Sequence, residues 1–401
     1  MKKEICFSPA DILLPHCEFE KWAVIACDQY TSEPEYWDEA YKIVGDAPSA
    51  LKIILPEARL KEDNSSAVEK INDTMQKYLD ENLFCEYKNS IFYVERTQSD
   101  GCVRRGIIGK IDLKEYDYTG RTENAQVRAT EKTVIERIPP RVKIRKDAVL
   151  EMPHIMLLID DPDFSVIEPL SGKKQEFEKL YDFDLMLGGG HIKGYRTDDA
   201  SAKAVIASLE KIYEKCNGPV FCVGDGNHSL AAGKASYEQS PNEKNRYALV
   251  EVVNIHDPAL RFEPIYRIVC GVEPENFISD FVDYCGGEVA AVGALKYKCV
   301  FSGGEKDISV SPMQKSAVGA LQGFLDEYTA THSGVSVDYI HGIQSIKNLA
   351  QRENAVGFIF DGISKSELFP AVTADGSLPR KSFSMGYADD KRFYIEARLI
   401  K

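Results

Sequence analysis

The sequence lacks the features of a disulfide-rich, zinc-binding or membrane-embedded protein. Its ten cysteines include no C-x-x-C pair and no cysteine–histidine group at zinc spacing, and most stand in apolar surroundings, as Cys222, Cys270 and Cys299 do. This pattern predicts reduced, mostly buried thiols and no structural zinc. No apolar run approaches the length of a transmembrane helix, and the charged first residues lack the apolar core of a signal peptide. We therefore expect a cytoplasmic protein.

Positive charge is also scarce. The 401 residues hold 49 Lys and Arg against 63 Asp and Glu, which gives a formal net charge of −14. Such a chain is not expected to bind nucleic acid or an anionic membrane as its main partner, although a local basic pocket is compatible with it. The sequence has no internal repeat and no low-complexity tract. Its length predicts two domains, which we place at residues 1–270 and 271–401.

Short apolar stretches alternate with segments of helical periodicity along the chain. Residues 91–96 and 103–111 predict a hairpin across the turn at 99–101, and residues 205–213 predict a helix capped by Thr197 and Asp198. From residue 271 onward the pattern is that of an α+β unit. We therefore expect an α+β or mixed α/β fold, in which mixed sheets are combined with helices.

The most informative stretch is P-V-F-C-V-G-D-G-N-H-S-L-A-A-G-K-A-S-Y, residues 219–237. Residues 220–223 predict a buried strand, and residues 224–226 predict a tight turn. Asn227 or Ser229 can then cap a helix. A strand, a glycine turn and a helix start direct backbone N–H groups and the positive end of the helix dipole at one place, which suits a phosphate.

Asp225 and His228 lie three residues apart at the mouth of this turn. They are candidates for ligand binding and catalysis; the alternative is that they only shape the turn and cap the helix. A hydrolytic Asp–His dyad is the least favoured interpretation, since no G-x-S-x-G or other nucleophile motif occurs. Another carboxylate, Asp28, follows the strand expected at residues 22–27, at a place where α/β sheets hold functional groups.

Residues 124–145 concentrate arginine in an otherwise acidic chain. Their charged residues are Arg128, Glu131, Glu136, Arg137, Arg141, Lys143 and Arg145. We expect a helix here, ended by Pro139 and Pro140. Such a helix is ordinarily a solvated face with ion pairs along it. We favour the alternative that it faces an anion held at the turn of residues 225–229. Glu131 is then expected to be an acid/base or metal-holding residue, rather than an ion-pair partner of Arg128.

Two further sets of charged residues follow. Asp160, Asp161 and Asp163 come after an expected strand and have the chemistry of a magnesium site. A D-D-P-D string is more often an exposed turn, so we assign no metal ligand. Arg380 and Lys381 stand in a glycine-bounded loop whose chemistry suits an anion, and an ordinary surface loop is the alternative.

These segments together resemble a widespread bacterial family, domain of unknown function 1015. The resemblance rests on G-I-I-G-K-I-D-L-K-E-Y-D, R-A-T-E-K-T-V-I-E-R-I-P-P-R, E-M-P-H-I-M-L-L-I-D-D, L-G-G-G-H-I-K-G-Y-R, F-C-V-G-D-G-N-H-S-L-A-A, R-F-E-P-I-Y-R and L-P-R-K-S-F-S-M-G. Many members carry D-G-H-H-R where this chain has D-G-N-H-S at residues 225–229. That signature is similar to the nucleotide-binding turn of the ParB and sulfiredoxin superfamily, which includes free serine kinases.

The resemblance implies a ParB/sulfiredoxin-like core in which the histidine and arginine of the turn hold nucleotide phosphates. Here His228 matches, whereas Ser229 replaces the arginine and puts one phosphate contact in doubt. Arg128 or Arg137 is expected to supply it from elsewhere. Genes of the family often lie beside serine biosynthesis genes, which favours a small metabolite as the substrate.

The first functional hypothesis is therefore a phosphotransferase that uses ATP or ADP with magnesium and acts on a small, serine-like hydroxyl compound. Its catalytic residues are expected to be Glu131, Asp225 and His228. The nucleotide-binding residues are expected to be Gly224, Gly226, Asn227, His228, Ser229, Arg128, Arg137, Arg141, Arg380 and Lys381. The second hypothesis is a non-catalytic nucleotide- or metabolite-binding regulatory protein, which the serine at position 229 slightly favours. The oligomeric state stays open.

Overall fold

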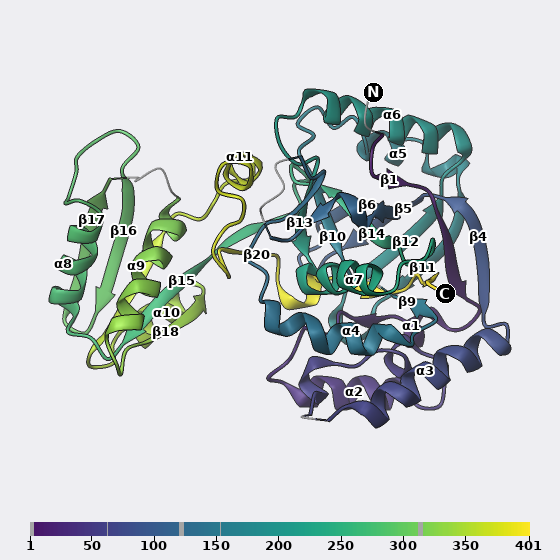
Figure 1. Cartoon of the computed structure of the whole chain (residues 1–401), viewed down its shortest axis with the longest axis horizontal. Coiled ribbons are helices and arrows are strands. Elements are labelled where there is room, and N and C mark those ends of the chain that lie inside the picture. The colour runs from purple at the N-terminus through teal and green to yellow at the C-terminus, as the bar shows by residue number, and fades with distance from the viewer. Residues whose placement is uncertain (1–3, 62, 120–123, 153, 312–315) are drawn as a thin grey trace. The chain divides into compact units, whose positions relative to one another are not determined.

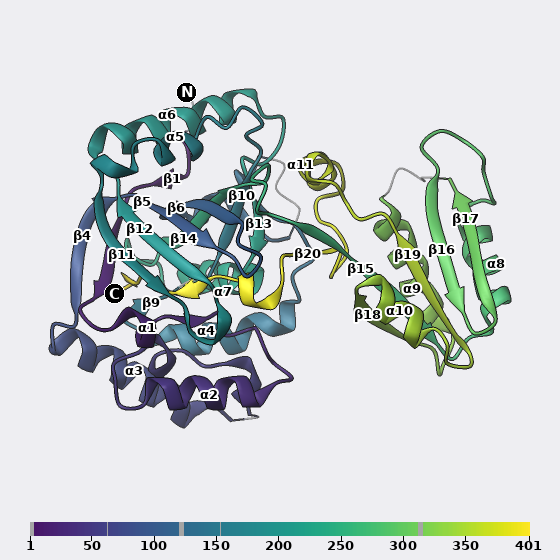
Figure 2. The ribbon, with the colours of Figure 1, turned by 180° about the vertical axis from the view of Figure 1, so that it is seen from behind.

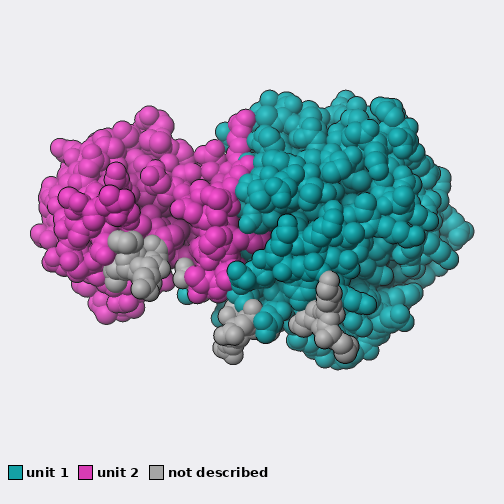
Figure 3. Space-filling view, turned by 90° about the horizontal axis from the view of Figure 1, so that it is seen from above, with its two compact units in different colours: residues 1–260, 387–401 teal, residues 261–386 magenta. Residues whose placement is uncertain are grey.

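The computed structural model describes residues 4–61, 63–119, 124–152, 154–311 and 316–401, without the side chains of Arg137 and Asp375. The chain forms two compact units, one of residues 1–260 with 387–401 and the other of residues 261–386 (Figure 3). Both units combine helices with a sheet, which is mixed in the first unit and antiparallel in the second, so the predicted α+β class is confirmed. The division into domains at residue 270 stays a prediction.

The strands of the described residues are mostly short. They are β1 (Phe7–Ser8), β2 (Ala10–Pro15), β3 (Val24–Ile25), β4 (Phe84–Ser90), β5 (Phe92–Thr97), β6 (Val103–Asp112), β7 (Tyr116–Asp117), β8 (Val127–Ala129), β9 (Leu150–Glu151), β10 (Met156–Ile159), β11 (Glu178–Asp184), β12 (His191–Arg196), β13 (Phe221–Asp225), β14 (Tyr247–Asn254), β15 (Phe262–Cys270), β16 (Leu295–Phe301), β17 (Gly304–Val310), β18 (Ser336–His341), β19 (Ala355–Phe360), β20 (Phe383–Met385), β21 (Phe393–Tyr394) and β22 (Arg398–Leu399).

The α-helices alternate with these strands along the chain. They are α1 (Phe19–Trp22), α2 (Pro34–Val44), α3 (Ser65–Asp80), α4 (Ile138–Lys146), α5 (Glu168–Ser171), α6 (Asp199–Lys215), α7 (Asn227–Gln239), α8 (Pro274–Tyr284), α9 (Ala317–Thr331), α10 (Ile343–Leu349) and α11 (Lys365–Asp375). Within the described residues, no helix is both long enough and apolar enough to cross a membrane.

The first unit is built on a large mixed sheet with the strand order β11-β12-β5-β6-β14-β10-β13-β8-β7, and β1 pairs with β6 (Figures 1 and 2). Side chains alternate between its faces, as the period of two of a strand requires. On β5, Phe92 and Val94 join a core that includes Trp37 of α2 and Met75 of α3. Tyr93 joins the second core, to which α4, α6 and α7 contribute. The sheet is therefore covered by helices on both faces.

Several local predictions are confirmed in this unit. The hairpin across residues 99–101 joins β5 to β6 in antiparallel pairing. The carboxylate of Asp198 caps α6 by accepting a hydrogen bond from the Ser201 N–H at 2.7 Å. By contrast, the strand expected at residues 22–27 is limited to β3, because Trp22 ends α1.

The helix predicted for residues 124–138 is wrong. Residues of this segment form β8, which pairs in parallel with β13, and α4 begins only at Ile138. Pro139 and Pro140 therefore stand in the first turn of α4, where a missing N–H costs little, instead of ending a helix. Glu131 lies in the connection between strand and helix, so the predicted helical spacing from Arg128 does not exist.

Residues 387–401 return to the first unit and are held there by buried ion pairs. The Arg392 guanidinium contacts the carboxylates of Glu251 on β14 at 2.9 Å and Glu396 at 2.7 Å. Arg398 contacts Glu151 on β9 at 2.8 Å. All of these side chains are nearly fully buried, so the C-terminal segment is fixed in the interior of the unit.

The second unit has a six-stranded sheet in the order β17-β16-β19-β15-β18, with β20 beside β15. Its core packs Phe277 and Phe281 of α8 and Phe324 of α9 against Phe358 of β19. The α+β unit expected for this part of the chain is present. Helix α11 was not predicted, although Ser364 and Glu367 form a capping box at its start.

Candidate functional site

The turn between β13 and α7 has the geometry of an anion site. Gly226, rather than Asn227 or Ser229 as predicted, is the N-cap of α7, and its φ of 79° is left-handed. Its N–H donates to the Asp225 carboxylate at 2.9 Å, and helical bonding begins with Leu230 N–H to Gly226 O at 3.0 Å. A glycine cap offers no side-chain acceptor to the first N–H groups of the helix, and helix starts of this kind suit an anion.

The arginine-bearing segment of residues 128–141 lies against this turn, as predicted. The backbone N–H of Val134 donates to His228 Nε2 at 3.2 Å, and the side-chain amide of Asn227 donates to the Glu131 carbonyl at 3.1 Å. Because Nε2 of His228 accepts a hydrogen bond, the neutral ring carries its proton on Nδ1. The two segments, nearly a hundred residues apart in sequence, therefore meet at the start of α7.

Ionisable side chains from three distant parts of the chain meet beside the turn. The Lys391 ammonium lies 3.4 Å from the Asp225 carboxylate. His154 places Nδ1 2.7 Å from the Tyr394 hydroxyl and Nε2 3.5 Å from the Asp28 carboxylate. His154 and Tyr394 are buried, whereas the other three side chains are partly exposed. We call these five residues the His154 cluster.

The electrostatics of the His154 cluster favour its charged pair. Burial alone would raise the pKa of Asp28, but the charge of His154 and hydrogen bonds from His154 and Gln29 hold that pKa well below its usual range. Burial alone would lower the pKa of His154, but Asp28, and more weakly Asp225, raise it above the ordinary value. Burial raises the pKa of Cys27 to about 12, with the Asp28 charge adding to the effect, so this thiol is not a nucleophile.

The predicted arginines are not all directed to the turn. Arg128 is buried on β8, where it is paired in register with Cys222 of β13. Arg141 on α4 forms an ion pair with Glu57. The side chain of Arg137 lies outside the described residues. The role of these arginines in binding stays a prediction.

Arg380 and Lys381 belong to the second unit. Their carbonyl oxygens accept hydrogen bonds from the buried Arg267 guanidinium at 3.1 and 2.9 Å. The Lys381 ammonium lies 5.0 Å from the centre of the Tyr339 ring. These contacts give the backbone of this loop a structural role, and its contact with a nucleotide stays a prediction.

The aspartates after β10 act as turn residues. The Asp161 carboxylate accepts hydrogen bonds from the backbone N–H groups of Ser165 and Val166 at 2.7 and 2.9 Å. Asp160 contacts His256 at 2.7 Å. Across the described ranges, no three or more His, Cys, Asp or Glu side chains form a metal-binding group.

A cavity of about 190 Å³ opens beside the start of α7, and we call it the α4–α7 cavity. It reaches the His154 cluster at His154 and Tyr394 and includes the predicted residues Arg141 and Ser229. Its lining residues are Cys27, Ile53, Ile54, Leu55, Glu57, Leu60, Met75, Pro140, Arg141, Ile144, Arg145, Ala148, Leu150, Glu151, Met152, His154, Ile155, Ser229, Ala232 and Tyr394.

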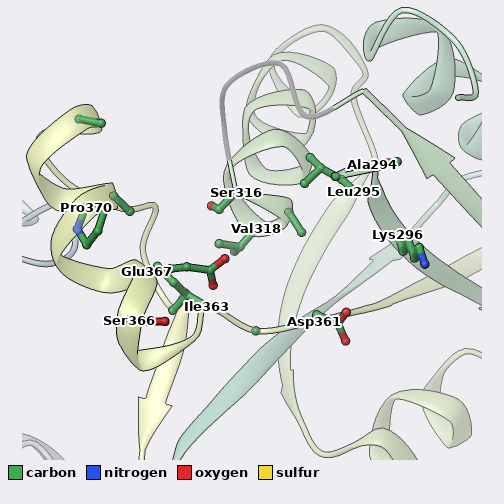
Figure 4. Close-up of a pocket in the computed structure, with 15 residues that line it drawn as sticks. Ala294, Leu295, Lys296, Ser316, Val318, Asp361, Ile363, Ser366, Glu367 and Pro370 are labelled. Atoms are coloured by element: carbon green, nitrogen blue, oxygen red, sulfur yellow. The ribbon is translucent and has the colours of Figure 1, made fainter. Parts of the chain in front are cut away.

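A larger cavity, of about 800 Å³, lies within the second unit between α9, α11 and the start of β16 (Figure 4). Glu367 extends from α11 toward Val318 of α9. Its carboxylate is committed to the helix cap, because it accepts hydrogen bonds from the Ser364 N–H and hydroxyl at 2.9 and 2.6 Å. Ser316 likewise caps α9 by accepting from the Gly319 N–H at 3.2 Å. Glu367 and Ser316 are thus committed to helix caps, and we place the candidate site in the first unit, where the His154 cluster lies beside the turn.

Three residues of the His154 cluster are not predicted from the sequence. His154 follows β9, and Lys391 and Tyr394 lie in the returning C-terminal segment. No local pattern marks them, because only the pairing of β13 with β10 and of β21 with β3 brings them to the turn. The fourth residue, Asp28, is indicated by its position directly after the strand expected at residues 22–27.

The fold and the site define an α+β protein with a glycine-capped helix start beside a buried imidazole that is paired with a partly exposed carboxylate. The chain belongs to the family described as protein of unknown function (DUF1015), which matches residues 10–368. No curated protein sequence matches it.

Solved structures that resemble it include a free serine kinase variant in complex with ADP, with a TM-score of 0.40 and 9% identity. That alignment covers 73% of this chain and 91% of the other. A conserved hypothetical protein from Pyrococcus furiosus aligns with a TM-score of 0.36, 10% identity, and coverage of 70% and 90%. C-terminally truncated SbnI from Staphylococcus aureus aligns with a TM-score of 0.37, 10% identity, and coverage of 73% and 81%.

Proposed function

We propose that this protein binds a nucleotide, or another phosphorylated small molecule, at the start of α7, and that it transfers a phosphoryl group to a small hydroxyl compound. The observation that carries the proposal is the glycine-capped N-terminus of α7, whose first N–H groups have no side-chain cap. Cationic groups stand nearby, namely Lys391 and, in its protonated form, His154. Fixed N–H donors together with cations suit a phosphate.

Phosphoryl transfer requires charge neutralisation and a group that orients the accepting hydroxyl. In the proposal, the helix start and Lys391 bind phosphate, while Asp225 and His228 position it. Glu131 is the proposed acid/base residue, since its backbone contacts Asn227 at the turn. ATP or ADP is the proposed phosphoryl donor. The ParB/sulfiredoxin-like character of the core and a cytoplasmic location belong to the same proposal.

A magnesium ion brought in with the nucleotide would fit only in part. Magnesium bound with phosphates needs one or two protein carboxylates, because phosphate oxygens and water complete its shell. Asp225 has the chemistry for this, but it now contacts Lys391 at 3.4 Å. Asp28 is engaged by His154. Asp225 is therefore the residue that would hold the ion, whose chemical contribution is to neutralise phosphate charge.

The second candidate function is ligand binding without catalysis. Ser229 stands where the related signature has arginine, and the Asp28–His154 pair favours its charged form, in which His154 cannot accept a proton. Both features remove groups that would assist transfer. A nucleotide-binding regulatory protein needs only the α7 site.

Binding and turnover separate these functions. We expect wild-type protein to bind ADP in calorimetry, and Asp225→Asn and His228→Ala to stay folded but lose that binding. His256→Ala is the matched control, because His256 also contacts an aspartate, Asp160, but lies near the other end of β10. Unchanged ADP affinity in both turn variants would contradict the proposal.

Turnover is measured with ATP, ADP and CTP plus magnesium against amino acids and hydroxy acids. Glu131→Gln should keep its melting temperature and nucleotide affinity while losing any phosphoryl transfer. Nucleotide binding without transfer to any acceptor would favour the regulatory function. Transfer that survives the Glu131→Gln substitution would remove Glu131 from the mechanism.

A further inference from the structure

The α4–α7 cavity has a hydrocarbon interior. Ile53, Met75 and Ile155 are buried lining residues, and Ile144 of α4 is half-buried. Leu60 also lines it and is 43% exposed, which places it at the mouth. A hydrocarbon surface that continues from an exposed leucine to a buried floor favours entry of an apolar group.

The charged arginines and glutamates of the wall are held in ion pairs. Arg141 pairs with Glu57, and Glu151 pairs with both Arg145 and Arg398. A polar group entering the cavity would lose its hydration and would have to compete with these ion pairs, which is unfavourable. The interior therefore selects for hydrocarbon rather than for a second charged group.

One end of the cavity is different, because it reaches the anion site. Ser229, in the first turn of α7, and His154 both line it. A ligand that fills the cavity and extends to this end places its polar head at the N–H groups of α7. The two features together describe an amphiphilic ligand, apolar at one end and anionic at the other.

The volume limits the size of the apolar part. An engineered apolar cavity of about 150 Å³ in another protein holds benzene. The α4–α7 cavity, at about 190 Å³, accommodates a single ring or a short branched chain. Serine is polar and has no hydrocarbon body to fill this space.

We propose that the small-molecule ligand of this protein is a phosphate or carboxylate with an apolar body of about the size of a benzene ring, and that this body occupies the α4–α7 cavity. This inference rests on the proposed function, because it places the anionic head at the start of α7. It narrows the phosphorylated small molecule proposed to bind there to one with a hydrocarbon body.

The test compares ligands that share a head group and differ in the body. Phenyl phosphate and methyl phosphate are titrated into the full chain by calorimetry, with benzoate as the carboxylate counterpart of phenyl phosphate. We expect phenyl phosphate to bind at least about tenfold more tightly than methyl phosphate, because an apolar pocket rewards each buried methylene by that order. Benzoate decides whether the head group is a phosphate or a carboxylate, since only the matching head should bind tightly.

Filling the cavity should remove this preference. Ile144→Trp places a larger side chain at a half-buried lining position and should bring phenyl phosphate down to the affinity of methyl phosphate. Ile206→Trp is the control, because Ile206 is a half-buried residue of α6 that packs on the second core and does not line the cavity. Leu60→Ser, at the exposed mouth of the cavity, should lower the affinity for phenyl phosphate without unfolding the protein.

The outcomes separate this inference from the proposed function. Equal affinities for phenyl and methyl phosphate in wild-type protein would overturn the inference alone. A preference that survives both Ile144→Trp and Leu60→Ser would also overturn it, because the body would then bind elsewhere. If neither ester, inorganic phosphate nor ADP binds, the proposed function fails, and the inference fails with it.

Discussion

Replacing Gly226 by alanine should destabilise the first unit for two reasons, an unfavourable backbone conformation and a steric clash. Its φ of 79° is left-handed, and an L-residue in that conformation costs about 1–2 kcal/mol. A Cβ built here would lie 2.9 Å from Ile155 Cα and 3.3 Å from Ile155 N, so the backbone must move. Overpacking of this kind costs about 1–3 kcal/mol. The expected loss is therefore about 2–5 kcal/mol in the free energy of unfolding.

Gly101→Ala is the matched control in the same unit. Gly101 has a φ of 82°, and a Cβ there meets nothing within 4 Å, so only the conformational cost of about 1–2 kcal/mol applies. Urea unfolding followed by tryptophan fluorescence isolates this unit, because the only two tryptophans of the chain, Trp22 and Trp37, are buried in it. Equal losses in the two variants would refute the steric argument and the tight approach of the turn to Ile155.

Two further predictions concern charged groups of the first unit. The pKa of His154 is raised, so the stability from its pair with Asp28 is fully present below the ordinary histidine pKa of 6.5 and is lost as pH rises through the raised value. The excess stability of wild type over His154→Gln in urea unfolding should therefore shrink as pH rises above 6.5, and a pH-independent difference would contradict the pairing. Arg392→Met removes the ion-pair partner of the buried Glu396 and leaves the buried Glu251 with only Arg104, at 3.6 Å, so it should cost about 3–5 kcal/mol. Arg246→Met removes a partly exposed pair with Asp112 and should cost less than about 1 kcal/mol. Similar costs by fluorescence-monitored unfolding would show that the Arg392 pairs are not buried in solution.

The sequence predicted those parts of the fold that are encoded locally. The β5–β6 hairpin follows from its turn residues, and α6 follows from Asp198 and the periodicity behind it. The start of α7 was located because a short strand, glycines and good helix formers occur in succession. Each of these signals lies within about twenty residues, so no knowledge of the rest of the chain was required.

The helix prediction for the segment around β8 is wrong because the conformation of this segment is set by distant residues. Its charges occur at the i,i+3 spacing typical of a helix, but the segment pairs in parallel with β13 and is therefore a strand. Pro139 and Pro140 are compatible with both the end and the beginning of a helix, and only the fold shows that α4 starts there. Non-local pairing overrode local pattern in this region.

Only part of the candidate site is predictable from the sequence, because some of its residues are brought there by non-local pairing. Asp225 and His228 are marked by the turn in which they stand, whereas Lys391 and Tyr394 carry no local signal. They reach the site because residues 387–401 return to the first unit after the second unit has been completed. A site built from residues near both ends and in the middle of the chain can be identified only when the pairing of the strands is known.

A crystal structure of the protein with ADP and magnesium is the direct test of nucleotide binding at the start of α7. We expect phosphate oxygens within hydrogen-bonding distance, about 2.7–3.2 Å, of the backbone N–H groups there. We also expect the Lys391 ammonium to contact the same phosphates. ADP bound at another place would contradict the proposed site. So would a crystal grown at saturating ADP in which the start of α7 is accessible and no ADP is bound.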